Sequence, residues 1–137
     1  MSRNPPHRVL VTGAGQGIGK AIARHLVNMG AEVVFADINL DAAKACTQKL
    51  GELATAFPVD VGNKQSVAEL FHLVRSKFGQ LHALVNNAGI FAHMRQPVEE
   101  LSLDDWNRTL STNLTGMFLC CKHAISLLRQ SKGSIVN

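Results

Sequence analysis

Glycines are concentrated in the stretch Thr12–Gly19, which reads TGAGQGIG. The apolar run Val9–Val11 precedes it, and apolar residues at helical spacing follow it, namely Ile18, Ile22, Leu26 and Met29. A glycine-rich turn between a strand and a helix lets the backbone approach a phosphate closely, and the free N–H groups of the helix N-terminus bind the anion. The spacing therefore predicts a site for a dinucleotide pyrophosphate, with a turn that binds no ligand as the alternative.

An acidic residue, Asp37, ends the next apolar run, Glu32–Asp37. It lies about 20 residues beyond the glycine stretch, where an acid commonly hydrogen-bonds the ribose hydroxyls of NAD. The same charge would repel the 2′-phosphate of NADP, and the nearby Ile38 and Gln16 supply no cation to offset it. We therefore expect NAD rather than NADP; the alternative is an Asp that only caps the following turn.

Polar residues also follow the third and fourth apolar runs. Asp60 and Val61 come after Ala56–Val59, where the carboxylate could meet the adenine amino group while Val61 packs on the ring. The segment Asn86–Gly89 follows Leu81–Val85 and could line the cofactor ribose. Turns built on Asp, Asn and Gly explain both segments about as well.

A conflict with helix propensity stands out in the C-terminal part of the chain. Asn113 falls in the middle of a long helical pattern, although Asn competes with the helix backbone, and Gly116 weakens the helix by about 1 kcal/mol relative to Ala. Such local conflicts often mark functional sites. The alternatives are a local kink and a close contact between helix and sheet.

Helical patterns alternate with the apolar runs. The second helix is expected to start at Asn39 or Asp41 and to close at Gly51. The third carries one apolar face, made of Val67, Leu70, Phe71, Val74 and Phe78. A long helix is expected over about 104–130, after a capping box of Ser102 and Asp105. Its main apolar stripe consists of Trp106, Leu110, Leu114, Met117, Phe118, Cys121, Ile125 and Leu128, while the opposite face carries Leu119, Cys120 and Leu127, more apolar than a solvated face should be.

This alternation predicts an α/β fold, a doubly wound parallel sheet with helices on both faces and strand order 3-2-1-4-5. A chain of 137 residues suits one domain. We expect residues 1–137 to form a single dinucleotide-binding domain that is truncated within its fifth strand, which starts at Gly133. Residues 1–7 are expected to be a short disordered lead.

Composition excludes several classes of protein. The chain is 46% hydrophobic and 18% charged, and its net charge of +4 comes from basic residues spread along the chain, which does not indicate a nucleic-acid partner. No apolar stretch approaches the length of a membrane span. Cys46, Cys120 and Cys121 form no metal or disulfide framework. We therefore expect a cytoplasmic protein without a metal site.

Taken together, these motifs resemble those of the short-chain dehydrogenase/reductase family, in the same order and over nearly the whole chain, from about His7 to Asn137. The resemblance implies a Rossmann fold that binds NAD. It implies that Gly13, Gly17, Ile18 and Gly19, with Gln16 in the same turn, hold the pyrophosphate, and that Asp37 selects NAD. It further implies that Asp60 and Val61 contact adenine, that Asn87, Ala88 and Gly89 contact the ribose region, and that Asn113 is a catalytic Asn holding a water in a proton relay.

The sequence also departs from this family. Members use a Ser, and a Tyr and a Lys in a Tyr-x-x-x-Lys motif, all located after the fifth strand, and this sequence contains no Tyr. His93 and His123 titrate near neutral pH in principle, but nothing in the sequence places them beside a nucleophile. We therefore expect the isolated chain to lack turnover.

The resemblance implies a cofactor-binding portion of an NAD-dependent oxidoreductase that interconverts a secondary alcohol and a ketone by hydride transfer. The alternative is a natural truncation that serves as a non-catalytic dinucleotide-binding or interaction module. A fold using S-adenosylmethionine is disfavoured by the full motif set. The resemblance also implies a homo-oligomer through the helix at 104–130. The loop Ile90–Glu100 does not specify a substrate.

Overall fold

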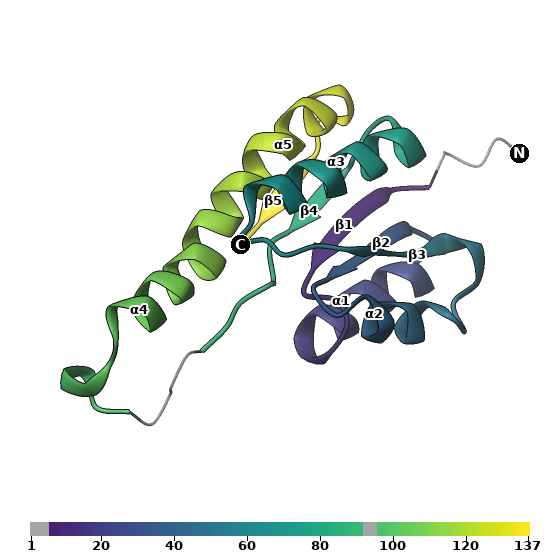
Figure 1. Cartoon of the computed structure of the whole chain (residues 1–137). Coiled ribbons are helices and arrows are strands. Elements are labelled where there is room, and N and C mark those ends of the chain that lie inside the picture. The colour runs from purple at the N-terminus through teal and green to yellow at the C-terminus, as the bar shows by residue number, and fades with distance from the viewer. Residues whose placement is uncertain (1–5, 92–95) are drawn as a thin grey trace, which may run out of the picture.

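The computed structural model describes residues 6–91 and 96–137, and places five parallel strands in one sheet of order β3-β2-β1-β4-β5 (Figure 1). The predicted strand order is confirmed. Most of the expected lead, residues 1–5, lies outside the described residues. The strands are β1 (Arg8–Thr12), β2 (Glu32–Asp37), β3 (Ala54–Pro58), β4 (Ala83–Val85) and β5 (Ser134–Val136).

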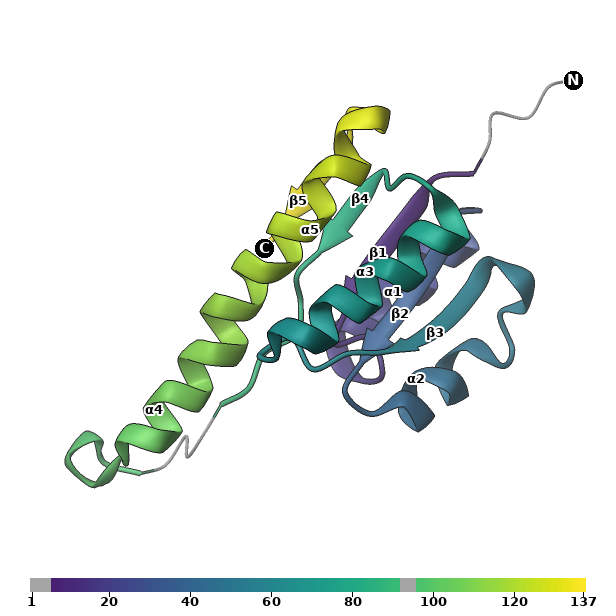
Figure 2. The ribbon, with the colours of Figure 1, turned by 45° about the horizontal axis from the view of Figure 1, so that its top comes forward.

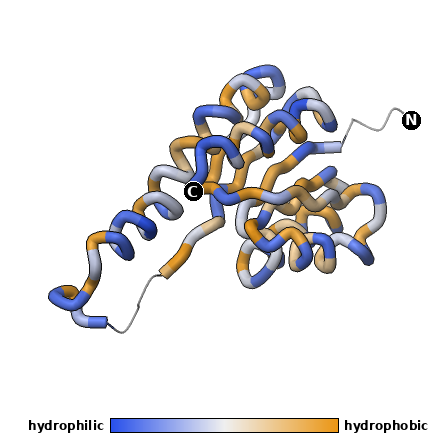
Figure 3. The backbone as a smooth tube through the Cα atoms, viewed as in Figure 1, coloured by the Kyte–Doolittle hydropathy of each residue, from blue (hydrophilic) through white to orange (hydrophobic). Residues whose placement is uncertain are grey.

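Helices cover both faces of the sheet, as Figures 1 and 2 show. One face carries α1 (Gly17–Asn28) and α2 (Leu40–Thr47), and the other carries α3 (Lys64–Phe78) and α5 (Gly116–Ser131). Each layer has its own cluster of buried apolar side chains, separated by the sheet. The central strands are accordingly hydrophobic along their length (Figure 3), as expected for parallel strands buried on both faces.

The apolar face expected for α1 is wrong at both of its ends. Ile18 is 74% exposed and Met29 is 72% exposed, whereas the helix buries Gly19, Ala23 and Val27 against the sheet. Small residues face the sheet here because they let the helix approach it closely. A Cβ atom at Gly19 would lie only 2.2 Å from the carbonyl oxygen of Gly13.

The predictions for α2 and α3 agree better with the structure. Asn39 caps α2 by accepting a hydrogen bond from the Ala42 N–H, but the helix ends at Thr47, and Gly51 instead begins the short 3-10 turn η1 (Gly51–Leu53). All five residues predicted on the apolar face of α3 are buried. Pro58 ends β3, which lies at the edge of the sheet, where the missing N–H is tolerated.

The expected single helix at 104–130 is divided. After the 3-10 turn η2 (Val98–Glu100), α4 (Leu103–Leu110) begins with the predicted Ser102 cap and passes through the π-helical segment η3 (Ser111–Thr115) into α5. The Gly116 N–H bonds the Ser111 carbonyl, five residues back. In Figures 1 and 2, α4 extends away from the sheet as the outer end of a rod.

The faces of this rod are exchanged relative to the sequence-based interpretation. The smaller stripe, Leu119, Cys120 and Leu127, is buried in the core together with Leu128. Most of the larger stripe is exposed, namely Trp106, Leu110, Leu114, Phe118 and Ile125. Gly116 explains the exchange, because it lets α5 rest directly on Val61; a Cβ atom there would lie 2.9 Å from Val61 Cγ2.

Candidate functional site

The glycine-rich turn joins the C-terminal end of β1 to the N-terminus of α1. Gly13 and Gly17 adopt positive φ angles of 66° and 54°, which only glycine adopts without strain. Gly17 has open space on its Cβ side, and the side chain of Gln16 does not cap the helix. No acidic residue lies in the first turn of α1. Gln16, Gly17 and Ile18 at this helix end line a cavity, and the N–H groups of a helix N-terminus can bind an anion such as a pyrophosphate.

Asp37 is tied to this turn. Its Oδ2 accepts a hydrogen bond from the Gly15 N–H at 2.8 Å, and its Oδ1 accepts one from the Asn39 N–H at 2.9 Å. The side chain is 9% exposed yet lines the neighbouring cavity. Each carboxylate oxygen has a second lone pair, so the group can hold the backbone and still accept a bond from a ribose hydroxyl.

Asn87 faces the glycine turn, and its side-chain amide is engaged there. Its Nδ2 donates to the carbonyl oxygens of Thr12 and Gly13 at 3.0 and 3.1 Å. In return, Thr12 Oγ1 accepts from the N–H groups of Asn87 and Ala88, both at 3.1 Å. The ends of β1 and β4 are thereby fixed to each other, and a ribose near this loop would meet the backbone of Ala88 and Gly89.

Asn113 makes a reciprocal pair of hydrogen bonds with one residue of the loop after β4. Its Oδ1 accepts from the Ile90 N–H, and its Nδ2 donates to the Ile90 carbonyl, both at 2.8 Å. This pairing accounts for an Asn in η3, because its amide satisfies loop backbone groups that no strand or helix pairs. Of the alternatives considered from sequence, the local break in the helix is present, and the close contact found is between the helix at Gly116 and Val61 of the loop after β3.

The loop after β3 closes the site from the other side. Asp60 Oδ1 accepts from the Gly62 N–H at 3.0 Å, which is the predicted Asx turn, and Val61 is buried beneath α5. Ser111 Oγ donates to the Gly62 carbonyl at 3.2 Å and so joins η3 to this loop.

These segments surround a cavity of about 750 Å³ at the C-terminal ends of the strands, within the range usual for cofactor sites. Most of the residues predicted from sequence line it: Gly13, Gln16, Gly17, Ile18, Asp37, Asp60, Val61, Asn87, Ala88 and Gly89. Gly19 and Asn113 do not. Gly19 lies behind Gly13, and Asn113 lies behind Ile90.

The cavity also contains residues that sequence reasoning missed. These are Ile38, Val59, Gly62, Ile90, Arg108, Ser111 and Thr112. Ser111 and Thr112 precede Asn113 by two residues and one residue, so the irregular Asn was a signal for these two, whereas Arg108 lies more than one turn away from it. Arg108 is the only cation in this lining, within the described part of the chain.

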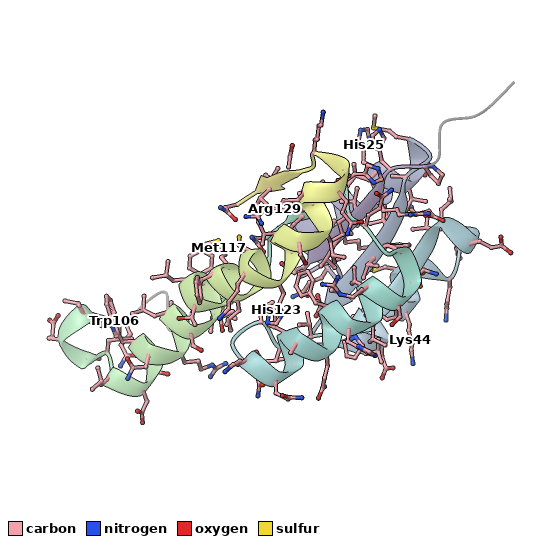
Figure 4. The ribbon with its side chains drawn as sticks, turned by 90° about the horizontal axis from the view of Figure 1, so that it is seen from above. His25, Lys44, Trp106, Met117, His123 and Arg129 are labelled. Atoms are coloured by element: carbon pink, nitrogen blue, oxygen red, sulfur yellow. The ribbon has the colours of Figure 1, made fainter. Side chains whose placement is uncertain are left out.

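Neither a metal centre nor a membrane span is found in residues 6–91 and 96–137. No group of three His, Cys, Asp or Glu side chains gathers there, and no helix of this part is long and apolar enough to cross a bilayer. His123 stacks on Phe71 between α5 and α3 (Figure 4), and it is not among the residues that line the cavity. His93 lies outside the described residues.

Comparison with known proteins agrees with this fold. Residues 7–137 match the family model described as short chain dehydrogenase, and the chain belongs to that family. It is 39% identical over 140 residues to a 3beta-hydroxysteroid dehydrogenase of Mediterraneibacter gnavus, covering 100% of this chain and 50% of the relative. It is 42% identical over 132 residues to a D-threitol dehydrogenase of Mycolicibacterium smegmatis, covering 93% and 50%.

A similar solved structure is that of a 3-ketoacyl-(acyl-carrier-protein) reductase from Brucella melitensis complexed with NADH. The TM-score is 0.87 at 30% identity, covering 91% of this chain and 51% of that one. The chain spans about half the length of the curated relatives it matches.

Proposed function

We propose that this chain is the cofactor-binding portion of an NAD-dependent oxidoreductase, folded as a single dinucleotide-binding domain. The observation that carries the proposal is the N-terminus of α1, which no side chain of the described residues caps and which lines one cavity with Asp37 and Asp60. A dinucleotide placed there has its pyrophosphate at α1, the adenosine ribose at Asp37 and adenine at Asp60 and Val61.

When bound, the nicotinamide ring accepts or donates a hydride. The chain's own residues bind and orient the two nucleotides. Asn113 holds the Ile90 backbone with one hydrogen bond at each polar atom of its side chain. Its amide oxygen keeps a second lone pair and its NH2 group a second N–H, so it can still bind the water of the predicted proton relay. A secondary alcohol or ketone is the proposed substrate, and relatives named for a hydroxysteroid, threitol and 2,3-butanediol support this class.

The test is to titrate the full chain with NADH and NADPH and to measure dissociation constants by calorimetry. We expect NADH to bind at least about tenfold more tightly, because a 2′-phosphate would bring a second negative charge next to Asp37. Asp37→Ala combined with Ile38→Arg should narrow this preference. Equal affinities in the wild-type chain would contradict the NAD assignment, and no binding of either would contradict the proposed function.

A non-catalytic dinucleotide-binding or interaction module is the second candidate, favoured by the exposed apolar side chains of Trp106, Leu114 and Phe118 along α4 and α5. The two candidates differ in whether a Tyr-x-x-x-Lys motif follows in the native reading frame, which the intact mass of the protein from its native source tests. For the 137 residues themselves, both candidates give the same expectation. We expect NADH oxidation by the chain with a panel of ketones to stay at the rate of the blank, and an enzyme-dependent rate would contradict this. The three free cysteines suit a reducing compartment, and we propose the cytoplasm.

We also propose that the chain forms a homo-oligomer through the α4–α5 rod. Trp106, Leu110, Leu114 and Phe118 follow one another at four-residue spacing and are exposed, Phe118 to 61%. Such a row is the pattern by which one helix packs on another.

A further inference from the structure

Arg108 lines the cavity although it belongs to α4, a helix that extends away from the sheet (Figure 1). It lies on α4, three residues before Ser111, so both side chains share one face of the helix. Ser111 is fixed to Gly62 by its hydrogen bond, which sets the rotation of this face toward the loop after β3. Arg108, Ser111 and Thr112 accordingly line the same cavity as Asp60 and Val61.

The Arg108 side chain is exposed at the edge of the cavity. Within the ranges that the structure describes, it makes no hydrogen bond or ion pair, and the ion pair found there joins Arg8 and Glu32. An unpaired guanidinium at the edge of a cavity is therefore free to bind a ligand.

The surroundings favour a planar ligand group at this end of the cavity. Val61 and Ile38 supply apolar surface to the cavity. Asp60 is the acidic residue next to Val61 on the loop after β3. The pyrophosphate, in contrast, is expected at the N-terminus of α1, on a different element. A guanidinium is planar and stacks on aromatic rings, where it also gains a cation–π interaction.

We propose that Arg108 covers the adenine base of the bound dinucleotide, with its guanidinium stacked on the purine ring. This inference rests on the proposed dinucleotide binding. It makes α4 part of the cofactor site and assigns to its one cavity-facing cation a role in affinity for the adenosine half.

The experiment measures the dissociation constants of NADH and ADP-ribose for the full chain and for Arg108→Ala, Arg108→Lys and Arg129→Ala. ADP-ribose lacks nicotinamide, so an effect shared by both ligands lies in the adenosine half. Arg129 is the matched control, an exposed Arg near the far end of the same rod that does not line the cavity (Figure 4).

We expect Arg108→Ala to weaken both ligands by about two- to fivefold, from the loss of a cation–π contact at the exposed edge of the cavity. Arg108→Lys should recover little of this, because Lys keeps the charge without the plane. Arg129→Ala should bind as the wild type does. Thermal unfolding of each variant shows that the fold is retained.

Three outcomes would overturn the inference. Unchanged affinity of Arg108→Ala would show that the side chain does not contact the ligand. Full rescue by Lys would show a general attraction of charge instead of stacking. Failure of the wild-type chain to bind either ligand would overturn the proposed function itself. This outcome is distinguishable from the other two because it is seen without any variant.

Discussion

At the scale of single residues, Asp37 shows how one side chain serves the fold and the site together. Its two oxygens hold the N–H groups of Gly15 and Asn39, one on each side of the β2 end. Sequence reasoning offered a cofactor ligand and a turn cap as alternatives, and the contacts establish the cap. If Asp37 also binds a ribose hydroxyl, it does so while it keeps these two backbone hydrogen bonds.

We therefore expect Asp37→Asn to destabilise the chain even without cofactor. An amide has one acceptor oxygen and would turn its NH2 group toward one of the two backbone N–H groups. The free energy of unfolding should fall by about 1–3 kcal/mol, as measured by urea denaturation. Asp41→Asn, an exposed residue in the first turn of α2, is the control, and equal loss in both variants would contradict the expectation.

His82 is the titratable residue with the clearest structural constraint. Its Nδ1 accepts a hydrogen bond from the Arg8 N–H at 2.9 Å, and its ring meets that of His7 edge-on. Burial, followed by the charges of His7 and Arg8, lowers the pKa of His82 below its usual 6.5. The folded state therefore favours the neutral ring.

This direction fixes a pH dependence. Below pH 6.5 the unfolded chain protonates His82 while the folded chain resists, so the unfolded state binds more protons and the free energy of unfolding falls as the pH is lowered. The loss should begin near pH 6.5 and end once the pH is below the lowered pKa. Urea denaturation between pH 5 and pH 8 should show that the free energy of unfolding changes less with pH for His82→Asn than for the wild type. A wild-type slope in His82→Asn would refute this account.

At the scale of elements, the position of the α4–α5 rod depends on Gly116. Helix propensity alone favours Ala at this position by about 1 kcal/mol. A Cβ atom there would lie 2.9 Å from Val61 Cγ2 and 3.1 Å from the Val61 carbonyl oxygen. The contact with the Val61 backbone decides whether Ala at this position raises or lowers the free energy of unfolding, because the loop after β3 would have to move.

Gly116→Ala is accordingly expected to lower the free energy of unfolding by about 1–3 kcal/mol, the usual cost of overpacking. It should also weaken NADH binding, since Val61 and Asp60 lie on the displaced loop. Thr115→Ala, at the preceding exposed position, controls for the helix. A more stable Gly116→Ala variant would show that propensity outweighs the contact.

The elements also show what the sequence could predict. The face of α3 is readable because Val67, Leu70 and Val74 stand out against polar neighbours. The faces of α1 and α5 are not, because Gly19 and Gly116 decide them through contacts that a hydropathy pattern does not encode. Arg108 escapes prediction for a related reason: the bond between Ser111 and Gly62 turns it toward the cavity.

At the scale of the whole molecule, the α4–α5 rod presents an exposed apolar row made of Trp106, Leu110, Leu114 and Phe118. Trp106 lies at its outer end and Met117 farther along it (Figure 4). A second copy would cover this row, and it would then restrain α4 and Arg108.

We expect the chain to be a dimer at micromolar concentration in sedimentation velocity runs, and the Phe118→Glu variant to be a monomer, since burying an unpaired carboxylate is strongly unfavourable. Gln130→Glu, an exposed position on the same helix, should leave the dimer intact. A monomeric wild type, or a dimeric Phe118→Glu variant, would contradict the proposed interface.

The π-helical segment has a consequence for changes in chain length. Each residue advances an α-helix by about 100°, so deleting one residue within Ser111–Thr115 would swing α4 about its axis by that angle while α5 stays packed on the sheet. Arg108 would leave the cavity, and Trp106 would leave the row that it shares with Phe118. In this segment the number of residues should therefore matter more than the identity of most of them. A deletion scan should show that deletions within Ser111–Thr115 are not tolerated at positions where single substitutions are.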